Sequence, residues 1–211
     1  MTTVAVIDFE TTGLSPALGD RATELAIVIL EGDQVVDRYQ SLMNAGVRIS
    51  SFIEAYTSIS NEMIETAPSA SAVMAQASRF VGQRPMAAHN ASFDRRFWIA
   101  ELERIDQPAE QAFCCTLLLS RRLYPLAPNY RLGSLAAFHS LPSSGRAHRA
   151  LADAEVAAAL LGRIRQDLRT QFKVPEPRHE QLMKLQACTR RAVPKAIERH
   201  LAAESGDQGR R

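Results

Sequence analysis

An apolar strand that runs into two acidic residues is the feature that most constrains the fold of this chain. Residues 4–7 read Val-Ala-Val-Ile, and Asp8 and Glu10 follow at alternate positions. Side chains two residues apart on a strand point the same way, so both carboxylates extend the face of Val4 and Val6. Like charges this close repel unless a metal ion or a proton intervenes. The strand therefore predicts a cation site, although for an isolated Asp-x-Glu pair a solvated strand end would be the better interpretation.

A third acidic residue follows another short apolar strand. Residues 86–88 lead into a polar turn and then a helix, for which Asn90 or Ser92 is the predicted N-cap. Asp94 falls in the first turn of that helix. An acid at this place can complement the helix dipole, or it can add a further carboxylate to the cation site.

A third segment places an acid and a histidine near the start of a long helix. Residues 145–153 lead into an apolar stripe that contains Leu160, Leu161 and Ile164, and Asp153 lies on the same stripe. An ionised carboxylate that faces a packed interior is unfavourable unless it is paired or binds a metal. His148 precedes Asp153 by five positions and cannot share its helical face, so it belongs to the preceding loop or first turn.

Together these residues resemble the five-residue signature of the DnaQ-like (DEDDh) 3′-to-5′ exonucleases, in the ribonuclease H-like superfamily. The matching residues are Asp8, Glu10, Asp94, His148 and Asp153. The likeness covers roughly residues 3–170 and includes the segment 19–25. Within the family, the chain resembles the exonuclease domain of the DNA polymerase III epsilon subunit. The related DEDDy group has a tyrosine four residues before its last aspartate, where this chain has Arg149. The resemblance therefore indicates the histidine subgroup.

The resemblance implies metal-dependent hydrolysis of phosphodiester bonds at the 3′ end of single-stranded or frayed DNA, releasing nucleoside 5′-monophosphates. Two divalent ions, Mg²⁺ or Mn²⁺, would stabilise the attacking and leaving oxygens. Asp8 would bridge both ions, Glu10 and Asp153 would complete the first site, and Asp94 would hold the second. His148 would be the general base, because an imidazole can accept a proton near neutral pH.

The same resemblance implies the substrate contacts. The backbone of Thr11, Thr12 and Gly13 would contact the terminal nucleotide, together with the ring of Phe93. A packing role for Phe93 against Phe97 remains an equal alternative, because residues four apart share a helix face.

The segment 52–60 departs from the family pattern, which usually reads like Leu-Thr-Gly-Ile. Tyr56 stands in place of the leucine and Ser58 in place of the glycine. These departures leave the substrate preference open without affecting the predicted chemistry.

The order of elements predicts an α/β, ribonuclease H-like fold with a central mixed five-stranded sheet flanked by helices. Three antiparallel strands are expected near 3–9, 23–30 and 35–43, and two parallel strands near 85–89 and 112–115. Helices are expected near 51–56, 61–65, 69–82, 92–105, 116–122, 132–139, 149–172 and 178–187. Residues 1–172 would form the exonuclease domain, and residues 173–211 a C-terminal helical extension with a basic, partly disordered tail.

Composition limits the partners. The net charge is +2, but residues 1–172 carry 16 basic and 18 acidic side chains, while residues 173–211 carry 9 and 5. No apolar run approaches the roughly 20 residues of a membrane helix, and no cleavage-site pattern follows the first strand. The three cysteines show neither metal-ligand spacing nor a disulfide framework. We therefore expect a cytoplasmic protein with no membrane association.

The sequence leaves several partners and activities open. RNA trimming or small-oligonucleotide hydrolysis is the alternative enzymatic function, since the signature residues do not distinguish DNA from RNA. A non-enzymatic subunit that holds a nucleic-acid end or a polymerase is the other alternative. Four carboxylates and a histidine in unfavourable positions favour an enzyme. Association with a DNA polymerase subunit and a homodimer are further candidate interactions.

Overall fold

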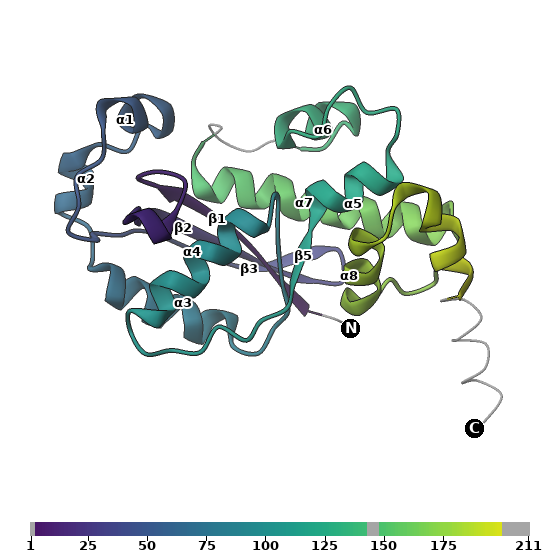
Figure 1. The fold of residues 1–211 in the computed structure, drawn as a ribbon, viewed down its shortest axis with the longest axis horizontal. Coiled ribbons are helices and arrows are strands. Elements are labelled where there is room, and N and C mark those ends of the chain that lie inside the picture. The colour runs from purple at the N-terminus through teal and green to yellow at the C-terminus, as the bar shows by residue number, and fades with distance from the viewer. Residues whose placement is uncertain (1–2, 143–147, 200–211) are drawn as a thin grey trace.

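A computed structural model describes residues 3–142 and 148–199, in which a mixed five-stranded sheet lies between two helical layers (Figure 1). The sheet has the order β3-β2-β1-β4-β5. Its strands are β1 (Thr3–Thr11), β2 (Ala22–Glu31), β3 (Gln34–Leu42), β4 (Met86–Ala88) and β5 (Phe113–Cys115). The first three strands pair antiparallel, while β4 pairs parallel with β1 and β5 pairs parallel with β4. The predicted α/β architecture, a mixed five-stranded sheet flanked by helices, is confirmed.

The helices follow the predicted order, with ends within two residues of the expected ones. They are α1 (Ser51–Thr57), α2 (Asn61–Glu65), α3 (Ala70–Val81), α4 (Ser92–Glu103), α5 (Thr116–Leu123), α6 (Leu132–Phe138), α7 (Ala150–Thr170) and α8 (His179–Ala187), with 3-10 turns η1 (Pro16–Leu18) and η2 (Arg190–Ala192). Serine hydroxyls at positions 50, 60 and 69 accept backbone N–H groups and so cap α1, α2 and α3. Within the described ranges, no helix combines the length and the apolar composition that a membrane crossing requires.

The predicted N-cap of α4 was wrong. Ala91 occupies that position and offers no side-chain acceptor, while Ser92 is already the first helical residue. Asn90 adopts a left-handed backbone with a φ of 63°, and its carbonyl accepts the Phe93 N–H at 2.9 Å. The turn is therefore closed by backbone hydrogen bonds, and the side chain of Asn90 does not cap the helix.

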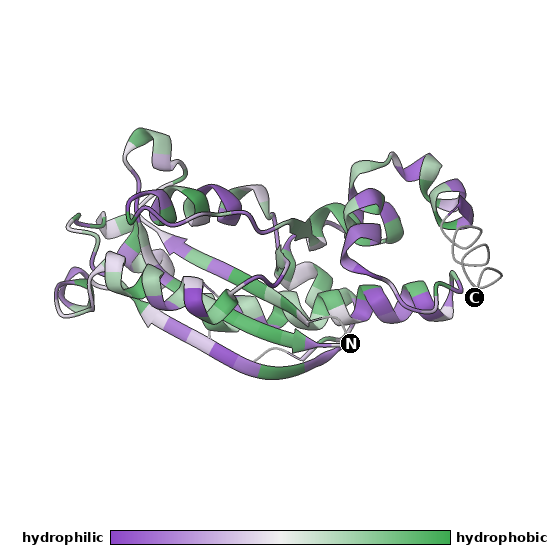
Figure 2. Ribbon diagram, turned by 90° about the horizontal axis from the view of Figure 1, so that it is seen from below, coloured by the Kyte–Doolittle hydropathy of each residue, from purple (hydrophilic) through white to green (hydrophobic). Residues whose placement is uncertain are grey.

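The alternation of side chains along β1 builds two cores, one on each face of the sheet. Val4 and Val6 pack with α5 and α7, whereas Ala5, Ile7 and Phe9 pack with α3 and α4. Hydrophobic residues dominate the inner strands in Figure 2, as expected for strands buried on both faces. Because the acidic residues continue the even-numbered face, they end up on the side of the sheet that α7 covers.

The C-terminal helix α8 completes the sheet edge at β5. The Gln186 side-chain oxygen accepts the Cys115 N–H at 2.6 Å, and its amide donates to the Phe113 carbonyl at 3.2 Å. His179 Nε2 bonds the Ala112 carbonyl at 3.1 Å. These side chains make hydrogen bonds to backbone N–H and C=O groups that would otherwise be free to pair with an additional strand.

The apolar face of α8 joins the core on the α7 side of the sheet. Leu182 and Leu185 are buried there, as are Val193 and Ile197 farther along the chain. In Figure 1 these segments lie at the opposite end of the molecule from α1 and α2. The predicted disordered tail falls largely on residues 200–211, which lie outside the described ranges.

Candidate active site

One cleft at the end of β1 collects every residue that the sequence singled out for chemistry or substrate contact. It is lined by Asp8, Glu10, Thr11, Thr12, Gly13, Phe93, Asp94, His148 and Asp153. Strand β1 supplies Asp8 and Glu10, and α4 supplies Asp94. Asp153 lies in the first turn of α7, and His148 lies two residues before that helix. Phe93 lines the cleft, and its ring centroid lies 5.0 Å from that of Phe97, so the packing contact is present and the contact with a nucleotide stays a prediction.

Backbone hydrogen bonds connect the acids to their neighbouring elements. The Phe9 N–H donates to Asp94 Oδ1 at 3.2 Å, which ties the start of α4 to β1 between its two acids. The His148 N–H donates to Asp153 Oδ2 at 3.0 Å. His148 has a left-handed backbone with a φ of 61°, as the chain turns just before α7. A register shift follows Glu10 in the β1–β2 ladder and redirects the chain at the cleft.

The electrostatics of the cleft demand positive charge. Burial, followed by the nearby charges of Asp153, Glu24 and Asp94, raises the pKa of Glu10 to about 8. Burial also raises the pKa of Asp94 to about 8, and burial together with Asp94 and Glu10 holds the pKa of Asp8 well above its ordinary value. A divalent cation would relieve this repulsion.

The donor set suits a hard divalent ion. Ligand atoms of Glu10, His148 and Asp153 lie within 4.8 Å of one another. Asp8 and Asp94 bring further carboxylates to the same cleft. Carboxylate oxygens are the ligands that Mg²⁺ and Mn²⁺ prefer. The residues present therefore fit divalent metal binding.

We expect the metal-free protein to lose stability as the pH rises from about 4 to about 8. In this window the raised pKa values of Glu10 and Asp94 make the folded chain bind more protons than the unfolded chain. Each unit of such a shift corresponds to about 1.4 kcal/mol before coupling is considered. Thermal melts in EDTA should show a falling Tm between about pH 5.5 and about pH 8.

Saturating Mn²⁺ should raise the Tm more at the higher pH, because metal binding to these acids competes with protons. Glu10→Gln should flatten the pH dependence in EDTA. An equal Mn²⁺ effect at both pH values, or a Glu10→Gln variant with the full wild-type slope, would contradict the role given to these carboxylates.

Glu24 and Arg149 form an ion pair beside the acidic cluster, in which the carboxylate is buried and the guanidinium is partly exposed. Glu24 lies directly opposite Glu10 in the β1–β2 ladder and is fully buried. Arg149 binds it in a bidentate arrangement at 3.1 and 2.7 Å, and the Ala150 N–H donates to it at 3.1 Å. Burial raises the pKa of Glu24, but hydrogen bonds from Arg149, Ala150 and Gln40 outweigh it and lower the value. The pair thus attaches the start of α7 to β2.

We expect Arg149→Gln to destabilise the fold by about 2–4 kcal/mol, because it leaves the buried Glu24 carboxylate without its cation. Activity should fall by about tenfold or more as the start of α7 loses its attachment beside His148. Chemical denaturation and initial-rate assays measure both effects. Arg38→Gln is the matched control, because Arg38 also joins the sheet to α7 but is 49% exposed in its pair with Glu155. A similar, small loss in both variants would contradict the prediction.

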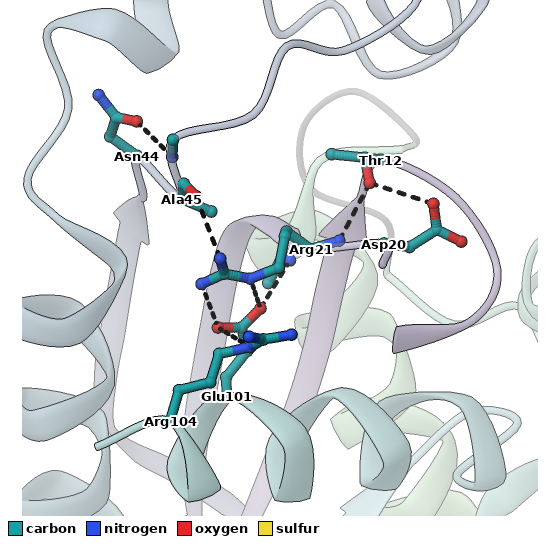
Figure 3. A network of polar contacts seen from close by, with 9 residues as sticks. Thr12, Asp20, Arg21, Asn44, Ala45, Glu101 and Arg104 are labelled. Carbon is teal, nitrogen blue, oxygen red and sulfur yellow. Dashed lines mark hydrogen bonds and ion pairs between the residues drawn. The ribbon is translucent and has the colours of Figure 1, made fainter. Parts of the chain in front are cut away.

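A second network fixes the loop between β1 and β2 onto α4 (Figure 3). Arg21 makes bidentate bonds to Glu101 through its Nε and terminal nitrogens, each at 2.8 Å. It also donates to the Ala45 carbonyl at 3.1 Å, and Arg104 lies 3.9 Å from the same Glu101 carboxylate. The helix that carries Asp94 is thereby held to the start of β2.

Asp20 shapes the loop that borders the cleft. Its carboxylate accepts the Ser15 N–H at 2.9 Å and the Thr12 hydroxyl at 3.4 Å (Figure 3). A Cβ at Gly13 would lie 2.4–2.6 Å from the Asp20 carboxylate atoms. A side chain at position 13 would therefore have to displace the Asp20 carboxylate from its hydrogen bonds to the loop.

The two residues that depart from the family pattern, Tyr56 and Ser58, lie in α1 and directly after it. The Tyr56 ring lies 4.0 Å from the His148 ring centroid, and the Phe52 ring stacks on Tyr56 at 6.1 Å. Ser58 follows α1 with a φ of 61°, a left-handed conformation that favours glycine. The aromatic pair therefore covers one side of the histidine, and the serine keeps the backbone turn expected of a glycine.

Two residues outside the predicted catalytic and substrate-binding set, Glu24 and His89, organise the site. Glu24 had a detectable signal, because it is an acid within an otherwise apolar strand. His89 bonds the Thr116 hydroxyl through Nδ1 at 2.9 Å and the Tyr130 carbonyl through Nε2 at 3.0 Å. Burial lowers the pKa of His89 to about 4, so its ring is neutral at physiological pH. Only the fold reveals this bridge.

Comparison with known proteins points in the same direction. The sequence model of the exonuclease family matches residues 5–161. The DNA polymerase III PolC-type protein of Oceanobacillus iheyensis is 36% identical over 167 residues, covering 79% of this chain and 12% of that protein. The 3′-5′ exonuclease DinG of Bacillus subtilis is 34% identical over 181 residues, covering 85% of this chain and 19% of that protein.

Solved structures share the architecture. Exonuclease X in complex with 5′ overhanging duplex DNA superposes with a TM-score of 0.68 at 27% identity, covering 87% of this chain and 99% of that one. Escherichia coli exonuclease I in complex with a dT13 oligonucleotide gives a TM-score of 0.70 at 18% identity, covering 82% and 43%. The latter likeness shows the fold alone.

The chain belongs to the exonuclease family, and its fold and signature residues place it among the 3′-to-5′ exonucleases of the DEDDh type. It spans less than a fifth of the length of the curated relatives named above.

Proposed function

We propose that this protein hydrolyses the terminal phosphodiester bond at the 3′ end of single-stranded or frayed DNA, releasing nucleoside 5′-monophosphates. The observation that carries the proposal is the convergence of four carboxylates and a histidine from β1, α4 and the start of α7 in one cleft. The DinG and PolC-type relatives and the DNA-bound neighbour favour DNA. RNA remains the second candidate, because a structural neighbour at 16% identity is a 3′-exonuclease with 3′-end specific recognition of a histone mRNA stem-loop.

We assign metal binding to Asp8, Glu10, Asp94 and Asp153. Two divalent ions bound there, Mg²⁺ or Mn²⁺, would supply Lewis-acid stabilisation of the charge that develops on the phosphate. These four carboxylates would supply the negative charge that binds the ions. Burial, together with repulsion among the acids, raises their pKa values.

His148 is the proposed general base. Its backbone N–H donates to Asp153, and one of its ring nitrogens lies within 4.8 Å of carboxylate oxygens of Glu10 and Asp153. A neutral imidazole in this place accepts the proton of an attacking water, and the adjacent carboxylates stabilise the imidazolium that results. Tyr56 packs against the ring and limits its rotation.

The terminal nucleotide would occupy the rest of the cleft. Thr11, Thr12 and Gly13 present backbone groups along one wall, and Phe93 provides an apolar surface for the base or sugar. Asp20 keeps the loop in this shape. Exposed apolar side chains at Leu14 and Phe52 border the same cleft.

We further propose a cytoplasmic role in proofreading or repair, either alone or together with a DNA polymerase subunit. The PolC-type relatives support the polymerase association, because these DNA polymerases contain the similar region as about a tenth of their own length. A homodimer is a separate proposal that light scattering of the purified protein would test.

The decisive experiment compares matched 5′-labelled DNA and RNA single strands incubated with Mg²⁺ or Mn²⁺. A ladder that shortens from the 3′ end of DNA, and that requires His148, supports the proposal. RNA-selective shortening would favour the alternative substrate. No shortening of either strand by folded protein with metal present would refute the enzymatic proposal and leave a binding subunit.

A further inference from the structure

A groove lined by residues of α5, α6 and the segment between these helices continues from the catalytic cleft; Figure 1 shows where the two helices lie. We call it the α5–α6 groove, and its own lining includes Arg121, Asn129, Tyr130, Arg131 and Ser134. It shares Tyr56, His89, His148 and Asp153 with the catalytic cleft. The two hollows are therefore continuous at the catalytic histidine. A polymer whose 3′ end lies at the acids has a path of contact along this groove.

The charge of the groove suits phosphate. Arg121 and Arg131 are exposed, and neither makes an ion pair with an acid in residues 3–142 and 148–199. Arg121 lies 5.8 Å from the Tyr130 ring centroid, which orients its planar guanidinium. Among the described residues that line the groove, Asp153 at the shared end is the one acid. Unpaired guanidinium groups beside an aromatic ring are typical of single-strand binding surfaces.

Hydrogen bonds fix the turn at residues 129–131, which carries Arg131. The Asn129 side-chain oxygen accepts the Arg131 N–H at 3.0 Å. His89 Nε2 donates to the Tyr130 carbonyl at 3.0 Å, and Nδ1 of the same ring bonds Thr116 at the start of α5. The neutral His89 therefore joins the catalytic cleft to the groove wall, and less ordering is needed when a strand binds.

We propose that the α5–α6 groove binds phosphates of the substrate strand on the 5′ side of the scissile bond, with Arg121 and Arg131 as their ligands. This inference rests on the proposed exonuclease function, since it takes the 3′ end to lie at the carboxylates. Its ligand is the backbone of a single nucleic-acid strand, which the arginines read by charge and without base specificity.

The test measures the affinity of a 5′-fluorescein-labelled single strand of about 12 nucleotides, in EDTA, over a series of salt concentrations. The Arg121→Gln/Arg131→Gln variant should bind about tenfold more weakly. Its slope of log K against log salt should be smaller by about 1.4, since each phosphate contact of a single strand contributes about 0.7. The matched control is Arg79→Gln/Arg190→Gln, which removes the same charge from exposed positions on α3 and η2. It should retain the wild-type affinity and slope.

A kinetic arm separates this inference from the proposed function. The p-nitrophenyl ester of thymidine 5′-monophosphate offers one nucleotide and no upstream phosphate. The ratio of kcat/KM for the long strand to that for the ester should fall about tenfold in the groove variant and stay at the wild-type value in the control. Arg121→Lys/Arg131→Lys should restore the salt slope.

Equal affinity, slope and kinetic ratio in the groove and control variants would overturn the groove while leaving the exonuclease in place. Failure of the wild-type protein to cleave either the ester or the strand would instead refute the proposed function, and the groove inference would fall with it.

Discussion

Asp8→Asn is expected to lower the rate of mononucleotide release by at least about 10³-fold at saturating metal. The amide keeps the shape of the side chain but removes a charge from the centre of the acidic cluster, where Lewis-acid stabilisation is worth several kcal/mol. Initial rates on a labelled strand measure the loss. Asp37→Asn, at an exposed position on β3, is the control and should keep wild-type activity.

The same variant should melt at a higher temperature than the wild type in EDTA. Burial and the neighbouring acids Asp94, Glu10 and Asp153 raise the pKa of Asp8, so a charge at this position opposes folding near neutral pH. Loss of activity combined with gain of stability is expected when a charged side chain is needed for activity but lowers the stability of the metal-free fold. A variant that keeps more than a tenth of the activity, or that melts below the wild type in EDTA, would contradict this account.

The sequence predicted the strands of the mixed sheet and the local positions of the acids because both follow from local rules. Alternation along β1 placed Asp8 and Glu10 on the face that α7 covers. Helix periodicity placed Asp153 in the first turn of α7, and His148 was expected just before that helix. These rules need only neighbouring residues, so they hold before any tertiary contact is known.

The remaining features depend on contacts between distant segments. The Glu24–Arg149 pair joins residues that are 125 positions apart, and the Arg21–Glu101 pair joins residues 80 positions apart. The tilted ring contact between Tyr56 and His148 likewise depends on α1 lying beside the start of α7. The N-cap of α4 was misjudged because backbone hydrogen bonds of the turn replaced the expected side-chain cap.

We propose that residues 173–199 belong to the folding unit of the exonuclease domain, although the family match ends at residue 161. Gln186 occupies backbone groups of β5, and Leu182 and Leu185 are buried in the core beside α7. Full burial of each such leucine contributes about 1.5–3 kcal/mol. Against a total stability of about 5–15 kcal/mol for an ordinary domain, several losses of this size are decisive.

A chain that ends at residue 172 is therefore expected to be largely unfolded or aggregated at 37 °C, whereas a chain that ends at residue 199 should melt like the full-length protein. Circular dichroism melts of the two truncations measure this difference. A milder variant, Gln186→Ala, should lower the free energy of unfolding by about 1–3 kcal/mol, because the Cys115 N–H and the Phe113 carbonyl lose their partner.

Because α8 lies at the far end of the molecule from α1 and the cleft, Gln186→Ala should leave kcat and KM unchanged at temperatures where the protein stays folded. If the 172-residue chain instead melts within a few degrees of the full-length protein, α8 is an appendage and the sheet edge at β5 is stable without it.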